Sequence, residues 1–146
     1  MFRALLTIIA SFSFSAFACP NLAGDFTCTY QGSSIDVTVA QRVENGVSIY
    51  TIMGYEIIAD GIRHNVPETD QVKEGTALAT CNGDLINANL TGKVYSSGKY
   101  GGEVNLDVEI AGLNKDGVAD AQADGSLTRP NGEVWPINGT FECTRK

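Results

Sequence analysis

Apolar and polar residues alternate along most of this chain with a period of two. In residues 103–110 every second side chain is Val, Leu or Ile, and the others are Glu, Asn or Asp. Residues 35–39 and 86–94 repeat the pattern. Because successive side chains of a strand point to opposite faces, this alternation predicts strands with one buried and one wet face. Such one-sided burial is typical of antiparallel sheets.

The alternation is interrupted at short intervals by Gly, Asn, Asp and Ser, which favour hairpin turns. These turn residues occur at positions 44–46, 82–84, 97–98, 114–117 and 130–132. The predicted strands cover residues 24–30, 34–43, 47–58, 75–81, 85–95, 102–111, 118–127 and 134–144, with a further short strand at 61–66.

Strands joined by hairpins leave two open sheet edges, and closing the sheet into a barrel removes both. We therefore expect an all-β, antiparallel up-and-down barrel of about eight strands. A β-sandwich is the alternative, because a period of two is common to both folds. Ala119, Ala121 and Ala123 give one strand a small inward face, over which we expect Trp135 to pack.

The first eighteen residues have the pattern of a secretory signal peptide: one cation at Arg3, an apolar stretch, and small residues at positions 16 and 18. The apolar part is shorter than the roughly 20 residues that cross a bilayer, so we expect no transmembrane segment. We expect cleavage after Ala18, a single β-barrel domain over 19–146, and a secreted or periplasmic protein. Residues 16 and 17 depart from a lipobox, so a disulfide at Cys19 is favoured over a lipid anchor.

All four cysteines, Cys19, Cys28, Cys81 and Cys143, follow the predicted cleavage site. An even number in an exported chain predicts two disulfides, for which three pairings are open. None of the cysteines has the C-x-x-C spacing of a zinc or redox motif. A bond that closes a loop of fifty or more residues, as Cys19–Cys81 or Cys28–Cys143 would, contributes about 4 kcal/mol in the chain-entropy model.

Charge narrows the classes of partner. Ten basic against seventeen acidic residues give a net charge of -7, which repels phosphate backbones, so we expect no nucleic-acid binding. The single histidine, His64, leaves little material for imidazole chemistry or a multi-histidine metal site.

Two polar motifs are candidates for a chemical role. Residues 114–120 resemble part of a calcium loop, but the first and twelfth ligand positions fall on Gly112 and Ala123. The carboxylates of residues 103–110 have the parity of the wet face, without a sign of a cleft or an opposing acid. We therefore expect no enzymatic activity, no metal and no cofactor.

Residues 19–27, Cys-Pro-Asn-Leu-Ala-Gly-Asp-Phe-Thr, followed by Tyr30, resemble the first strand of the avidin and lipocalin (calycin-type) group of up-and-down barrels. Those families begin with a Gly, one spacer and an aromatic residue, positions matched here by Gly24 and Phe26. Avidins also place a Cys and a Leu just before this motif. The resemblance covers about ten residues and implies a barrel fold with a pocket.

A barrel of this size holds one small ligand or packs its own interior. We expect an exported, non-catalytic barrel that binds a small apolar or amphipathic ligand inside. The alternative is a packed structural or protein-interaction module whose partner is an envelope or extracellular protein. An interior cavity of about 300 Å³ or more would favour the ligand-binding hypothesis. The side chains expected to form the apolar walls are Phe26, Tyr30, Ile49, Leu106, Val108, Ala121, Trp135 and Phe141.

Overall fold

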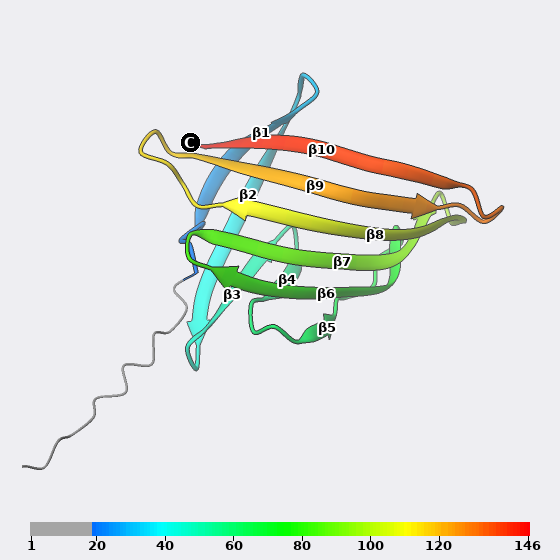
Figure 1. Ribbon diagram of the computed structural model, residues 1–146, viewed down its shortest axis with the longest axis horizontal. Coiled ribbons are helices and arrows are strands. Elements are labelled where there is room, and N and C mark those ends of the chain that lie inside the picture. The colour runs from blue at the N-terminus through cyan, green and yellow to red at the C-terminus, as the bar shows by residue number, and fades with distance from the viewer. Residues whose placement is uncertain (1–18) are drawn as a thin grey trace, which may run out of the picture.

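The computed structural model describes residues 19–146, and the predicted signal peptide of residues 1–18 lies outside them. Ten strands form one antiparallel sheet in the order β4-β3-β2-β1-β10-β9-β8-β7-β6-β5 (Figure 1). The strands are β1 (Gly24–Tyr30), β2 (Ser33–Glu44), β3 (Val47–Ile52), β4 (Tyr55–Ile58), β5 (Arg63–Asn65), β6 (Val72–Asn82), β7 (Leu85–Ser96), β8 (Lys99–Ala111), β9 (Val118–Thr128) and β10 (Val134–Arg145). Strands adjacent in sequence pair with one another except β4 and β5, which are the two ends of the sheet, and β1 pairs with β10.

The predicted fold class is confirmed: the protein is an all-β, antiparallel, nearly closed barrel with two disulfides. One strand more than the nine predicted segments is present, because the segment predicted as one strand over 47–58 forms β3 and β4. Met53 and Gly54 make the turn between them, with φ of 52° and 84°. This turn needs positive φ at both central residues, a conformation that Asn or Gly signals and Met does not. The short strand expected at 61–66 is present as β5.

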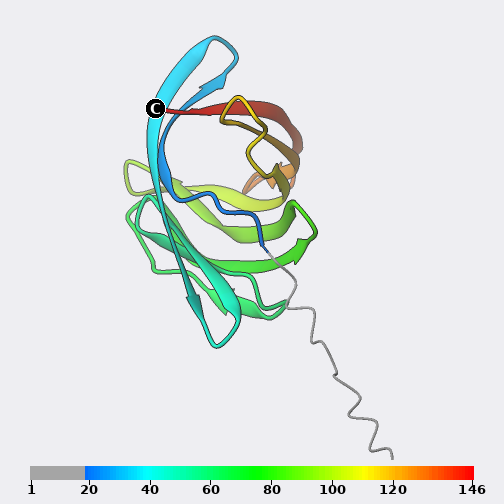
Figure 2. The same cartoon turned by 90° about the vertical axis from the view of Figure 1, so that its left-hand side faces the viewer.

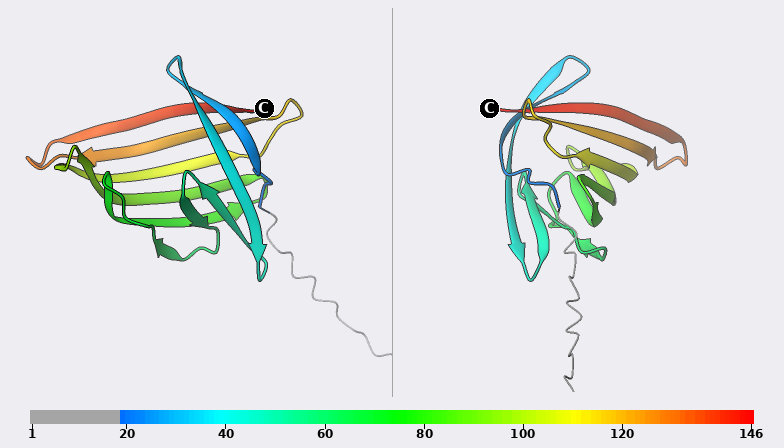
Figure 3. Two further views of the ribbon diagram at one scale, coloured as in Figure 1. Left: turned by 180° about the vertical axis from the view of Figure 1, so that it is seen from behind. Right: turned by 60° about the vertical axis from the view of Figure 1, so that its left-hand side comes forward.

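The barrel consists of two halves, β1–β4 and β6–β10, which face each other across the interior (Figure 2). The ladder between β1 and β10 has four residue pairs, from Phe26 opposite Arg145 to Thr29 opposite Glu142. On the other side, the Gly61 N–H donates to the Ala79 carbonyl at 2.9 Å. The long strands β7–β10 extend past the part that the β1–β4 half covers (Figure 3).

The segment before β1 fills one end of the interior. Leu22 packs with Tyr50, Ile86 and Ala119 in a cluster whose members are each at most 5% exposed. The Tyr50 hydroxyl donates to the Pro20 carbonyl at 2.7 Å. Burial raises the pKa of Tyr50 to about 12, because the phenolate would be poorly solvated there. This region is the packed end of the barrel.

Two disulfides, Cys19–Cys81 and Cys28–Cys143, join the halves. The first ties the segment before β1 to β6, and the second ties β1 to β10. Residues 19–146 contain no free cysteine, which is compatible with an oxidising extracellular space. Over the same residues there is no helix long and apolar enough to cross a membrane.

Candidate functional site

The apolar inner surface of the β6–β10 half is only partly covered away from the packed end. Cross-strand pairing places Leu90, Leu106 and Ile137 on one row of this surface, with Val104, Leu127 and Trp135 on the next. We call the two rows, together with Val108, the open inner face. All seven side chains keep contact with solvent, and Trp135 is 46% exposed.

An aromatic pair lies at the border between the packed end and the open inner face. The rings of Tyr30 and Phe141 stack with centroids 4.6 Å apart, and Ala121 is paired with Phe141 on the neighbouring strand. A Cβ at Gly139 would lie 2.8 Å from the Tyr30 ring, so only glycine leaves room for this stacking. The structure therefore brings together three of the predicted wall residues. Phe26 is 3% exposed on the same inner surface of β1.

Ile49 is a predicted wall residue that the structure places elsewhere. It pairs with Arg42 on β2 and with Ile58 on β4, whereas its neighbour Tyr50 points into the interior cluster. The Ile49 side chain therefore points to the outer side of β3 and not into the barrel interior. It is nevertheless buried, with 6% of its surface exposed. The error arises because β3 carries Val and Ile at odd positions but Tyr and Ile at even ones, so alternation does not identify its inner side.

The expectation that Trp135 packs over the alanines of β9 is wrong. Trp135 pairs with Leu127 beside the β9–β10 turn, whereas Ala119 is at the other end of the hairpin, opposite Cys143. The Arg129 guanidinium lies 4.3 Å from the centre of the Trp135 ring, a cation–π contact. Hydrogen bonding from Trp135 lowers the pKa of Glu133. Trp135 thus forms the rim of the open inner face.

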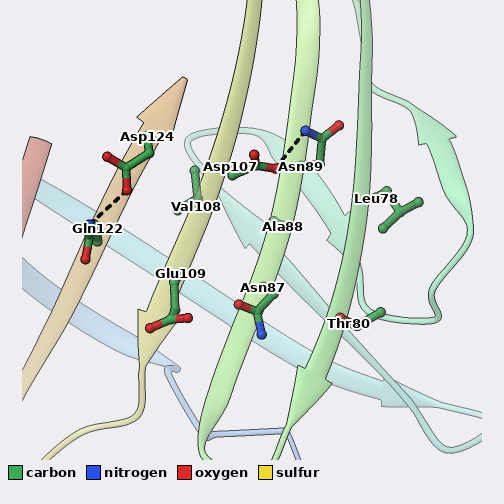
Figure 4. A pocket seen from close by; sticks show the side chains of 10 residues that line it. All are labelled: Leu78, Thr80, Asn87, Ala88, Asn89, Asp107, Val108, Glu109, Gln122 and Asp124. Carbon is green, nitrogen blue, oxygen red and sulfur yellow. Dashed lines mark hydrogen bonds between the residues drawn. The ribbon is translucent and has the colours of Figure 1, made fainter. Parts of the chain in front are cut away.

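The outer surface carries a hollow of about 460 Å³ over β6–β9 (Figure 4). Four of its polar side chains are hydrogen-bonded in pairs: Asn89 Nδ2 donates to Asp107 Oδ1 at 2.9 Å, and Gln122 Nε2 donates to Asp124 Oδ2 at 2.8 Å. A second hollow of about 410 Å³ on the same surface includes Lys93, which donates to Glu74. The residues around the first hollow are Leu78, Thr80, Asn87, Ala88, Asn89, Asp107, Val108, Glu109, Gln122 and Asp124. Of these, Ala88 and Val108 have the inward parity of their strands and lie between outward-facing neighbours.

The carboxylates of residues 103–110 lie on the wet face, as predicted, and Asp107 and Glu109 border the outer hollow on that face. Asp107 on β8 is directly opposite Asp124 on β9, and both belong to the hollow. The alternation of β9 places Asp124 on the wet side, but the contact depends on the register between β8 and β9. The local sequence of either strand does not encode that register.

The other polar motifs serve local structure. Asn114 Oδ1 accepts the N–H groups of Asp116 and Val118 at 2.9 and 3.0 Å, which closes the turn before β9. His64 Nε2 lies 2.8 Å from Asp60 Oδ2. The Ile62 backbone N–H is the main cause of the lowered Asp60 pKa, with a smaller contribution from His64. Residues 19–146 hold no group of three or more His, Cys, Asp or Glu placed to bind a metal ion.

No family model, curated protein or solved structure matches this chain. The resemblance to avidins and lipocalins therefore rests on the sequence of residues 19–30.

Proposed function

We propose that the protein is an exported, non-catalytic binding module whose open inner face takes a small apolar or amphipathic molecule. The observation that carries this proposal is the solvent contact retained by Trp135 and its apolar neighbours. Covering roughly 200 Å² of such surface contributes about 5 kcal/mol before the costs of association. A bound apolar group would therefore gain free energy without a change in the barrel.

The rim of the open inner face favours an amphipathic ligand. Arg129 stacks on Trp135 and approaches Glu133 Oε2 to 3.9 Å, so charged groups border the apolar surface on one side. A ligand with an apolar chain and an anionic head would place its chain along Leu106 and Ile137 and its head beside Arg129. The packed end stops the chain at the Tyr30–Phe141 pair.

The tryptophan provides the test because Trp135 is the single one in the chain. Dodecanoate, titrated below its micelle concentration, should shift the tryptophan emission to shorter wavelength and saturate. Leu106→Asn should weaken this binding about tenfold through lost apolar contact. Asn105→Ala alters the adjacent, outward-facing residue of the same strand and should leave the affinity unchanged. Equal affinities for the two variants, or a titration without saturation, would contradict the proposal.

A further inference from the structure

Most of strand β10 lacks a neighbour on one side. β10 pairs with β9 from Val134 to Thr144, but its four pairs with β1 begin only at Glu142. Figure 1 shows β1 crossing β10 near its end, while the β1–β2 hairpin turns away from the sheet. Residues 134–141 therefore form a strand edge with no partner strand among the described residues. We call them the free edge.

The direction of the backbone groups on the free edge follows from two hydrogen bonds at its end. The Arg145 N–H donates to Gly117 on the β9 side, and the Lys146 N–H donates to Asp25 on the β1 side. The β9–β10 register continues without a bulge, so the direction alternates along the strand. Even-numbered residues therefore direct their N–H and C=O groups away from β9.

The free edge consequently presents a row of unpaired backbone groups. N–H donors come from Val134, Asn138 and Thr140, and these residues together with Pro136 supply the carbonyl acceptors. Pro136 has no N–H, and in sheets proline is confined to positions whose missing N–H would face an open edge. The position of Pro136 thus agrees with the alternation derived from the hydrogen bonds.

The side chains of the free edge provide little of the protection usual for an exposed edge. Charged residues, bulges and short length normally prevent pairing with other chains. Residues 134–141 carry no charge, and Val134 is 59% exposed. Pro136 is their one feature that opposes pairing. Glu133 and Glu142 flank the segment at its two ends.

We propose that the free edge binds an extended peptide segment of another protein by strand addition, antiparallel to β10 and in line with β1. The flanking Glu133 and Glu142, with the net charge of -7, favour a segment with a basic residue at each end. A second copy of this chain fits poorly. Symmetric antiparallel pairing of the free edge would bring two acidic copies, each with a net charge of -7, side by side.

This site differs from the small-molecule site because it is built from backbone groups rather than apolar side chains. The pattern of β1 predicts which peptide residues would form the ladder. In β1, the Asp25 carbonyl accepts a backbone hydrogen bond from β10. The next residue, Phe26, instead directs its side chain into the interior. Residues of an added strand that bond to β10 therefore have side chains that point outward.

The first experiment uses a labelled eight-residue peptide with Lys at each end and alternating Val and Thr between. Fluorescence anisotropy should show saturable binding of this peptide. In the bound peptide we expect the Val side chains to point inward and the Thr side chains to point outward. N-methylation of the three Thr residues should weaken binding more than tenfold, because their N–H groups face β10. N-methylation of the three Val residues is the matched control and should change affinity less than twofold. Equal effects of the two modifications would overturn the proposal.

The second experiment changes the protein. Asn138→Pro removes one donor from the free edge and should weaken binding about fivefold, the scale of one hydrogen bond, whereas Asn138→Ala should not. Pro136→Val adds a donor and should tighten binding by a similar factor. The tighter binding expected of Pro136→Val tests the proposal even if Asn138→Pro disturbs folding. Unchanged affinity in Pro136→Val would contradict the role of the edge.

Amide hydrogen exchange gives a readout specific to the backbone. The amides of Asn138 and Thr140 should exchange fast in the free protein and slowly with the peptide, whereas those of Ile137 and Gly139 should be slow in both states. Edge amides already protected by self-association, as measured by sedimentation, would assign the edge to a second copy and refute the proposal. Dodecanoate binding and its loss in Leu106→Asn are independent of these outcomes, so each site can fail alone.

Discussion

Removal of the Cys28–Cys143 disulfide should destabilise the barrel at the junction of its two halves. The β1–β10 ladder has four residue pairs, and this bond lies at the third of them, one pair before the strands separate. The variant is Cys28→Ala with Cys143→Ala, which keeps Cys19–Cys81. Alanine retains the Cβ atoms and introduces no polar group at the buried Cys28 position.

The magnitude follows from the loop that the bond closes in the unfolded chain. Cys28 and Cys143 are 115 residues apart, but the Cys19–Cys81 bond offers a shorter path. That path runs back from Cys28 to Cys19, across the bond, and from Cys81 to Cys143, about 71 residues in all. The chain-entropy relation then gives about 4 kcal/mol, or a Tm lower by about 15 °C for a domain of this size.

Urea unfolding followed by circular dichroism at pH 7 without reductant measures this loss, and mass spectrometry confirms the remaining disulfide. Cys19→Ala with Cys81→Ala is the matched control, because its loop of 62 residues predicts a similar loss of about 4 kcal/mol. A loss below about 1 kcal/mol for the first variant would show that the four-pair ladder holds the halves together without the bond. That result would refute the reasoning.

Three further predictions concern single sites. Tyr50→Phe should cost about 1 kcal/mol at pH 7 through the lost hydrogen bond. Because the Tyr50 pKa is raised from 10.0 to about 12, the stability that its neutral form supplies is present below pH 10 and lost as the pH rises toward 12. The urea midpoints of the unmodified protein and of Tyr50→Phe should therefore converge at pH 11. A difference between the two midpoints that stays constant with pH would contradict this. Gly139→Ala should lower stability by about 1–2 kcal/mol in thermal melts, and less when Tyr30→Ala removes the facing ring; an equal loss in both backgrounds would exclude the clash. Asp60→Asn should lower the Tm at pH 7, where the carboxylate accepts from the backbone. Its pKa lies below the ordinary 3.8, so this stability is lost as the pH falls through that lowered pKa, and a Tm difference that does not narrow on acidification would argue against it.

The strands and most hairpins could be predicted from the sequence because alternation and turn residues are local signals. The position of Trp135 was also within reach: a turn centred at residue 131 places Trp135 opposite Leu127 rather than near Ala119. The side of the strand on which Ile49 lies could not be predicted, because β3 has apolar residues on both sides. The free edge depends on where β1 leaves β10, which is set by contacts between the first and last strands. No local pattern encodes that pairing.

The pairing of β1 with β10 also constrains how the protein matures. Cys28 is synthesised long before Cys143, and Cys19, nine residues away, is the cysteine nearest to it in sequence. Closing a short loop costs less entropy than closing a long one, so early oxidation favours a non-native Cys19–Cys28 bond. Thiol exchange must then resolve this bond once β10 arrives. An oxidoreductase that isomerises disulfides should therefore raise the yield of native protein, whereas a simple oxidant should trap the shuffled form.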